Sequence, residues 1–247
     1  MNDEQKRPPI DALPSDVRAR IVEWTKTLEG ILGDDLVGIL VHGSVARGEY
    51  RPGESDVDAI IVLKDASFAK LDAISNAMQV ARYSARIEAM ILTEQEIAGA
   101  SDVFPLLYDD IKRCHFLLAG RDPFDAVEVH DTHRRLRIEQ ELREARIRLR
   151  RAVTDAAGAR EALGGGVVRK LKQVRGPLHA LLALAGIACP PDLAGVVTKA
   201  CERYGVDPAP LRAARESPEK AHEAFGALLD KAIEEVNAMD GFGGKGA

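Results

Sequence analysis

Three short apolar runs constrain the fold of this chain more than any other feature of its sequence. They span residues 36–41, 56–63 and 85–92, and each is too short to form a buried helix. Turn-forming residues or helical patterns separate them along the chain. We therefore expect three strands of one sheet, covered by the helices that alternate with them.

Apolar residues recur at three- and four-residue steps in the segments around these runs. Residues 15–33 and 68–83 are expected to form amphipathic helices on this ground. Thr93 and Glu96 have the spacing of a capping box, which predicts the start of another short helix.

The second half of the chain has a helical pattern throughout. A long helix is expected over residues 132–153, with a break at the three glycines 164–166. Gly176-Pro177 is expected to end one helix and start the next, because glycine suits a helix end and proline a first turn. The predicted architecture is an α/β (α+β) domain with a mixed sheet over residues 1–125, an all-α helical bundle over 126–240, and a disordered tail at 241–247.

The turn after the first expected strand has the composition of a phosphate-binding turn. Gly43 lets a phosphate approach the backbone closely, and Ser44 offers a hydroxyl group for a hydrogen bond. Arg47 follows one turn later with a planar guanidinium that suits phosphate.

Carboxylates mark the next two expected strands. Asp56 and Asp58 are two residues apart, so both side chains point to one face, about 6–7 Å apart along the backbone. A divalent cation between them removes their repulsion, and Mg²⁺ prefers carboxylates together with phosphate oxygens. Glu88 is a third carboxylate, in a run that is otherwise apolar, where it needs a partner.

This ordered set resembles the signature of the DNA polymerase β superfamily of nucleotidyltransferases. The matching residues are Gly43-Ser44, then Ser55-Asp56-Val57-Asp58, then Glu88. The Ser-Asp-x-Asp pattern that begins at Ser55 is similar to that of the minimal nucleotidyltransferases. The helical second half makes the chain resemble bacterial aminoglycoside nucleotidyltransferases more loosely.

The resemblance implies an enzyme that moves a nucleoside monophosphate, AMP from ATP, onto a hydroxyl group with release of pyrophosphate. Gly43, Ser44, Arg47 and Ser55 would then contact the nucleotide. Asp56, Asp58 and Glu88 would ligate two Mg²⁺ ions, with Glu88 as the alternative proton acceptor. The acceptor is expected to be a small molecule, a protein or tRNA.

Structural readings of the same residues stay open. Glu88 taken alone would also serve as a structural partner of Arg82 or Arg86, and Asp56 and Asp58 taken alone as solvated residues at a strand end. The many arginines of residues 132–153 form either a solvated helix face or a surface that contacts an anion. For the whole chain, the alternative is a catalytically silent nucleotide-binding or partner-binding module of a toxin–antitoxin system.

Composition excludes several classes of protein. The 247 residues carry a formal net charge of −5, which does not predict non-specific binding to a polyanion. The polar N-terminal segment lacks the apolar core of a signal peptide, and no stretch is apolar enough for a membrane span. A cytoplasmic protein without membrane contact is expected, and oligomers are compatible with the sequence.

Overall fold

The computed structural model describes residue 10 and residues 13–239. Contacts divide the chain into two compact units, Met1–Val129 and His130–Ala247, and each is described by itself. The predicted domain boundary at residue 125 stays a prediction, and the predicted tail 241–247 lies outside the described residues.

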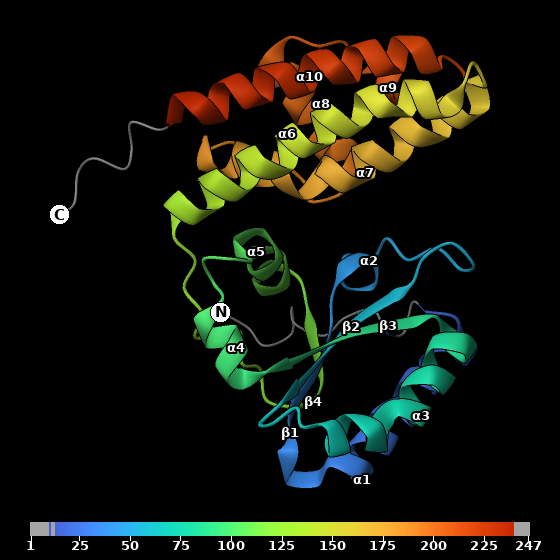
Figure 1. The fold of residues 1–247 in the computed structure, drawn as a ribbon, viewed down its shortest axis with the longest axis vertical. Helices are drawn as coiled ribbons and strands as arrows, with labels where there is room; N and C mark the ends of the chain where they lie inside the picture. Colours follow the sequence, from blue (N-terminus) through green and yellow to red (C-terminus); the bar gives the residue numbers. More distant parts are fainter. Residues whose placement is uncertain (1–9, 11–12, 240–247) are drawn as a thin grey trace, which may run out of the picture. The chain divides into compact units, whose positions relative to one another are not determined.

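The first unit contains a mixed four-stranded sheet in the order β3-β2-β1-β4 (Figure 1). β1 runs antiparallel to both of its neighbours, β2 and β4, whereas β2 and β3 run parallel. The prediction of a mixed sheet followed by a helical region is therefore confirmed. The strands are β1 (Leu36–Val41), β2 (Val57–Leu63), β3 (Ile87–Thr93) and β4 (Phe116–Gly120).

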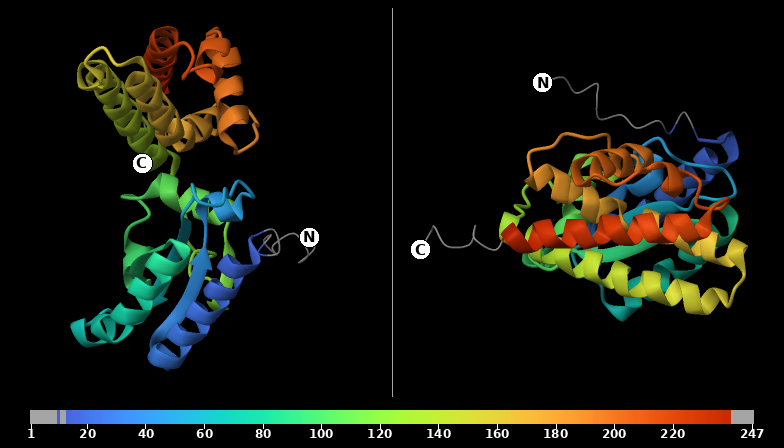
Figure 2. Two further views of the ribbon diagram at one scale, coloured as in Figure 1. Left: turned by 90° about the vertical axis from the view of Figure 1, so that its right-hand side faces the viewer. Right: turned by 90° about the horizontal axis from the view of Figure 1, so that it is seen from above.

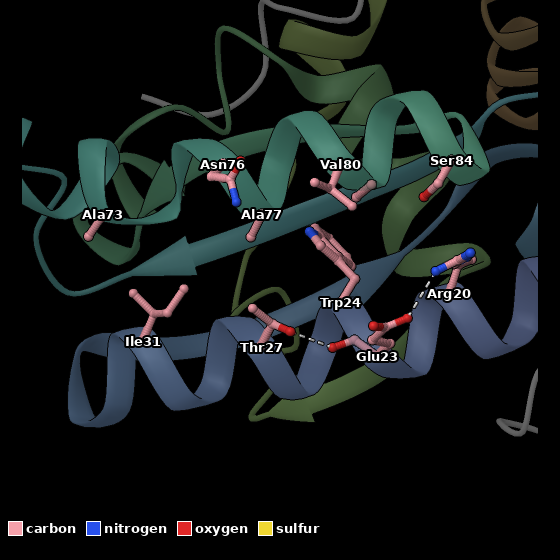
Figure 3. A pocket seen from close by; sticks show the side chains of 11 residues that line it. Arg20, Glu23, Trp24, Thr27, Ile31, Ala73, Asn76, Ala77, Val80 and Ser84 are labelled. Carbon is pink, nitrogen blue, oxygen red and sulfur yellow. Dashed lines mark hydrogen bonds and ion pairs between the residues drawn. The ribbon is translucent and has the colours of Figure 1, made fainter.

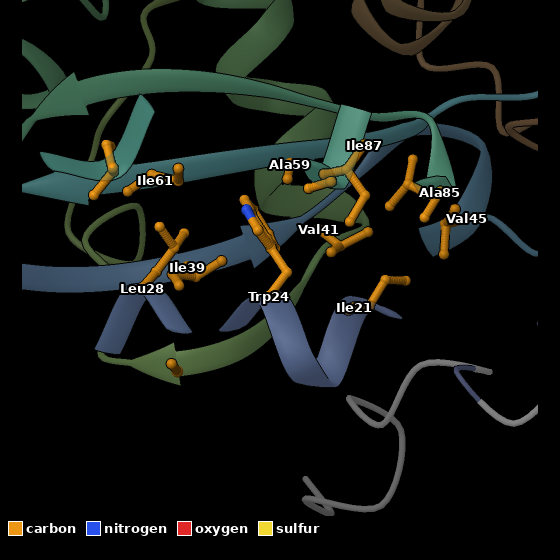
Figure 4. Close-up of a cluster of buried hydrophobic side chains, with 14 of the residues drawn as sticks. Ile21, Trp24, Leu28, Ile39, Val41, Val45, Ala59, Ile61, Ala85 and Ile87 are labelled. Carbon is orange, nitrogen blue, oxygen red and sulfur yellow. The ribbon is translucent and has the colours of Figure 1, made fainter. Parts of the chain in front are cut away.

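Two long helices cover one face of this sheet. α1 (Ser15–Leu32) and α3 (Phe68–Ala85) pack against each other and against the strands. Figure 4 shows the resulting core, in which Trp24 and Leu28 of α1 lie against Ile39 and Ile61 of the sheet. Each fully buried aliphatic side chain of this kind contributes about 1.5–3 kcal/mol to folding.

Shorter helices cover the opposite face. α4 (Glu94–Gly99) starts at the predicted capping box, which the structure confirms, and α5 (Pro105–Arg113) follows it. Tyr108 of α5 packs edge-to-face on Phe124 with ring centroids 5.3 Å apart, and both lie in a core with Ile60 and Val62 of β2. Because both faces are covered, β2 is buried along nearly its whole length, which explains its continuous apolar sequence.

Two short elements join the long ones in the first unit. The 3₁₀ turn η3 (Gly33–Asp35) connects α1 to β1, and α2 (Gly43–Ala46) directly follows β1. The turn residues that the sequence associates with phosphate therefore lie at the end of a buried central strand.

The second unit is helical throughout its described residues. Its three long helices, α6, α7 and α10, pack against one another and belong to the part of the chain coloured from yellow-green to red in Figure 2. The bounds are α6 (Asp131–Ala156), α7 (Arg160–Leu184), α8 (Leu193–Tyr204), α9 (Ala209–Arg212) and α10 (Pro218–Ala238).

The two predicted interruptions of this helical region are wrong. α7 runs through both the glycine triplet and Pro177 without ending. The break lies earlier, where Ala157 and Gly158 take left-handed backbone angles. Gly164 has a packing reason instead, because a Cβ there would lie 2.7 Å from the carbonyl oxygen of Ala214.

Among the residues that the structure describes, no helix combines the length and the apolar character required to cross a membrane.

Candidate active site

The turn between β1 and α2 is built around the carboxylate of Asp58. Gly43 has a φ of +68°, and a Cβ at this position would lie 2.1 Å from Asp58 Oδ2. The backbone N–H of Ser44 donates a hydrogen bond to the same carboxylate. Only glycine satisfies both the left-handed backbone and this close approach.

The parallel pairing of β2 and β3 places the carboxylates on one side of the sheet. Asp58 and Glu88 are direct register partners, so their side chains leave the sheet from the same face. Val57 and Ala59 point to the opposite face, into the core beneath α1 and α3. Asp56, which precedes β2, shares the side of Asp58 by the alternation of the chain.

Electrostatics show that these carboxylates act on one another. Burial raises the pKa of Asp58, and the negative charges of Asp56 and Glu88 raise it further. The charge of Arg47 and the hydrogen bond from Ser44 oppose this shift of the pKa. A cation beside Asp58 would therefore relieve both desolvation and repulsion.

Two arginines from the end of α3 hold the outer carboxylates. Arg86 Nε lies 2.8 Å from Asp56 Oδ1, and Arg82 Nε lies 3.1 Å from Glu88 Oε1. The structural alternative for Glu88, a pair with Arg82, is therefore present in the structure. Such a pair is compatible with a second role, since the side chains are half exposed.

Arg47 is held by two carboxylates rather than pointing freely into solvent. Its Nε donates to Glu49 Oε2 at 2.9 Å and its Nη1 to Asp110 Oδ2 at 3.0 Å. Only 11% of the side chain is exposed. The residue thereby ties the segment after α2 to α5, and it contributes positive potential at Asp58.

The remaining predicted nucleotide contact, Ser55, closes a turn. Its hydroxyl oxygen accepts a hydrogen bond from the backbone N–H of Arg51 at 3.1 Å. Arg86 Nη1 donates to the carbonyl oxygen of Gly53 in the same loop, at 2.7 Å. The loop between α2 and β2 is therefore fastened both to itself and to the end of α3.

His42, which precedes the turn, is a neutral structural residue. Burial, with smaller contributions from Arg47 and His115, lowers its pKa to about 4, and Asp110 only partly opposes the shift. The interpretation of His42 as a packed side chain agrees with this environment.

The donor chemistry of the three carboxylates fits Mg²⁺. In the described part of the chain, no three His, Cys, Asp or Glu side chains converge closely enough to hold a metal ion. Mg²⁺ needs only one or two protein carboxylates, because phosphate oxygens and water complete its shell. Asp58 and Glu88, in register on one face, supply two such carboxylates.

A separate groove of about 260 Å³ lies between α1 and α3 (Figure 3). Trp24, Ile31 and Val80 line it, with the ion pair of Arg20 and Glu23 among its lining residues. The two helices cover the face of the sheet opposite to Asp58, so this groove is not part of the carboxylate site.

Comparison with known proteins gives the family. Residues 25–146 match the family described as nucleotidyltransferase domain. The chain carries a nucleotidyltransferase domain. The resemblance to the polymerase β type, stated from the sequence, is confirmed, and the protein is a transferase.

A solved structure shares the fold of this nucleotidyltransferase. It is the spectinomycin adenyltransferase from Enterococcus faecialis, crystallised with ATP and spectinomycin. The sequences are 12% identical, the TM-score is 0.53, and the match covers 89% of this chain and 98% of that chain. At this identity the likeness shows the fold alone. No curated protein matches the sequence.

Sequence reasoning named Arg82 as a partner of Glu88, but it missed the carboxylate partners of Arg47 and Arg86. Asp110 binds Arg47 across a separation of 63 residues, a contact that only the tertiary fold creates. Arg86 lies inside the run 85–92 that was expected to be a strand, so its position at the end of α3 was not predicted. By contrast, Asp58 and Glu88, which are register partners in the sheet, are both residues that the sequence signature picked out.

Proposed function

We propose that this nucleotidyltransferase moves a nucleoside monophosphate from a Mg²⁺-bound triphosphate, ATP, to a hydroxyl group and releases pyrophosphate. The observation that carries the proposal is the in-register placement of Asp58 and Glu88 beside the turn at Gly43 and Ser44. The ATP bound in the spectinomycin adenyltransferase supports the choice of donor.

Asp56, Asp58 and Glu88 would hold the two metal ions. When bound, Mg²⁺ would neutralise the triphosphate and stabilise the charge of the departing pyrophosphate. Asp58 is held in place by the Ser44 N–H, so its orientation is set before the substrate arrives. Glu88 is the alternative acceptor for the proton of the attacking hydroxyl.

The turn and its surroundings would hold the triphosphate. The Ser44 hydroxyl and the Gly43 backbone would contact the terminal phosphates, and Ser55 would line the same loop. Arg47, fixed by Glu49 and Asp110, would act through its positive potential rather than by a flexible approach. A preorganised charge of this kind needs no rearrangement during the reaction.

The acceptor would be a hydroxyl group on a small molecule or a protein. The spectinomycin in the related fold favours a small molecule. Asp110 and Asp122 are acidic side chains of a kind that would attract a polycationic acceptor, but both are already engaged, Asp110 with Arg47 and Asp122 with His115. A weakly charged acceptor therefore suits this chain better than a polycation.

The arginines of α6 give little support to a polyanionic acceptor such as tRNA. Most of them pair with acidic residues one turn away or on α10, as in the contact of Arg146 with Asp230 at 2.7 Å. The pairs along the helix are Arg134–Asp131, Arg135–Glu139, Arg137–Glu141, Arg143–Glu139, Arg148–Glu144 and Arg151–Asp155. These pairs favour the solvated-face interpretation of the helix.

Asp58→Asn is the direct test. With labelled ATP, Mg²⁺ and a panel of hydroxyl-bearing acceptors, the wild-type protein should release pyrophosphate. We expect Asp58→Asn to lower the rate more than about a hundredfold. Losing a metal ligand should reduce activity more than losing a residue that only hydrogen-bonds to such a ligand. Asp72→Asn, an identical change at an exposed position on α3, should leave the rate unchanged.

Thermal unfolding of both variants serves as the control for folding. A folded Asp58→Asn protein with wild-type activity would refute the assignment of the site. A wild-type protein that binds ATP but releases no pyrophosphate with any acceptor would favour the catalytically silent module instead.

A further inference from the structure

Two guanidinium groups occupy the outer carboxylates of the candidate site. Arg82 and Arg86 are one helical turn apart at the end of α3, and they bind Glu88 and Asp56 respectively. The central carboxylate, Asp58, receives the Ser44 N–H instead. In this structure each of the three carboxylates thus has a positive or hydrogen-bonding partner from the protein itself.

The backbone at Arg86 has a conformation that is costly for a residue with a side chain. Arg86 ends α3 with φ 52° and ψ 40°, the left-handed conformation that glycine usually takes after a helix. A residue with a Cβ costs roughly 1–2 kcal/mol in this region. Among the described residues, only Arg86 and Ala157 adopt a positive φ without being glycine.

The side chain explains why arginine stands there. Arg86 donates to both Asp56 and the Gly53 carbonyl oxygen, while its own carbonyl oxygen accepts the N–H of Val57 at 2.9 Å. It therefore joins a proposed metal ligand, the loop before it and the first residue of β2. A glycine would relieve the backbone but would leave Asp56 without this partner.

The arginine pairs are weak enough to be exchanged. The side chains of Arg86 and Asp56 are 48% and 44% exposed, and those of Arg82 and Glu88 are 64% and 47% exposed. Ion pairs with this exposure contribute only about 0.2–1 kcal/mol. A divalent cation that needs the same oxygen atoms can displace them.

We propose that Arg82 and Arg86 are positioning residues that hold Glu88 and Asp56 in the metal-free protein and are displaced when the divalent cation binds. The inference rests on the proposed function. It adds a consequence that the reaction alone does not require: the arginines compete with the metal and set its apparent affinity.

Titration with Mn²⁺ in the absence of nucleotide, with free Mn²⁺ measured by electron paramagnetic resonance, tests the proposal. Arg86→Gln and Arg82→Gln should each bind Mn²⁺ up to about fivefold more tightly, the affinity equivalent of an exposed ion pair. Arg86→Lys keeps the charge and should lie between Arg86→Gln and wild type.

Two further variants separate charge from folding. Arg86→Gly removes the guanidinium and also relieves the backbone. It should therefore match Arg86→Gln in Mn²⁺ affinity but be more stable than Arg86→Gln in urea. Arg51→Gln removes a charge from the same loop, where the side chain is 74% exposed and near Glu54, and it should leave the affinity unchanged.

The outcomes distinguish this proposal from the proposed function. Mn²⁺ binding that is lost in Asp58→Asn but unaffected or weakened in both glutamine variants would overturn the exchange and leave the metal site standing. A wild-type protein that binds no Mn²⁺, with or without ATP, would overturn the metal site itself and the exchange with it.

Discussion

Replacing Gly43 with alanine tests whether the turn after β1 is shaped to hold Asp58. The new Cβ would lie 2.1 Å from Oδ2, 2.9 Å from Cγ and 3.2 Å from Cβ of Asp58. The neighbouring atoms belong to a short side chain on a central strand, which has little freedom to move away. We therefore expect the carboxylate to be displaced rather than merely crowded.

Two energetic effects add in Gly43→Ala. A residue with a Cβ at the φ of +68° costs roughly 1–2 kcal/mol. Displacement of the carboxylate also breaks its hydrogen bond from the Ser44 N–H, and bonds to charged groups contribute about 1.5–3 kcal/mol. The free energy of unfolding should therefore fall by roughly 2.5–5 kcal/mol, with activity almost lost because Asp58 no longer has its orientation.

Gly48→Ala is the matched control. Gly48 has a φ of +73°, but a Cβ there would meet no atom within 4 Å. This variant carries the backbone strain alone, so urea unfolding should show a loss of roughly 1–2 kcal/mol and the transfer rate should be unchanged. Equal effects of the two alanine substitutions on stability and rate would refute the role assigned to Gly43.

Two other features give predictions of stability. Because burial lowers the pKa of His42 to about 4, unfolded chains bind a proton between pH 6.5 and 4 that folded chains do not. Stability is thus lost as the pH falls through this window, by up to about 3 kcal/mol, and His42→Gln should lose less between pH 7 and 4.5 in urea unfolding. In α7, Gly165→Ala would meet only the end of the flexible Arg169 side chain, at 3.4 Å, and should raise stability by up to about 1 kcal/mol. Gly164→Ala, 2.7 Å from the Ala214 carbonyl oxygen, should instead lower it by about 1–3 kcal/mol, and equal thermal shifts of the two glycine variants would contradict the packing argument.

Periodicity predicted the long elements of the fold because burial dictates their sequences. The apolar run of β2 and the helical spacing of α1 both follow from a sheet covered on two faces. β4 was not anticipated, since its five residues pair only with β1 at the sheet edge and alternate weakly in burial. Short edge strands depend on a neighbour's hydrogen bonds more than on their own pattern.

The helix breaks of the second unit show where local preference is overruled. Glycine and proline each weaken an isolated helix, yet α7 continues through Gly164 and Pro177. Both residues are buried, and the absence of a side chain at Gly164 permits the approach of the chain near Ala214. Tertiary packing compensates for the unfavourable propensity, and no local rule contains that information.

The candidate site was predictable where its chemistry depends on order along the chain. Asp58 and Glu88 have positions within two strand patterns, and the parallel pairing brings them into register. The restraint of Arg47 by Asp110 was not predictable, because it joins two segments through side chains alone. The general rule is that strand positions fix which residues share a face, whereas ion-pair partners follow only from the assembled fold.

In the proposed reaction, the Ser44 N–H would link the binding of phosphate to the position of Asp58. A backbone amide has one hydrogen to donate, and in this structure that hydrogen is directed at the Asp58 carboxylate. A triphosphate bound at the same turn would have to share or replace this hydrogen bond. A cation beside Asp58 would stabilise the negative charge of the carboxylate in place of that bond. Triphosphate and metal should therefore bind more strongly together than separately, because each removes the cost that the other meets at this turn.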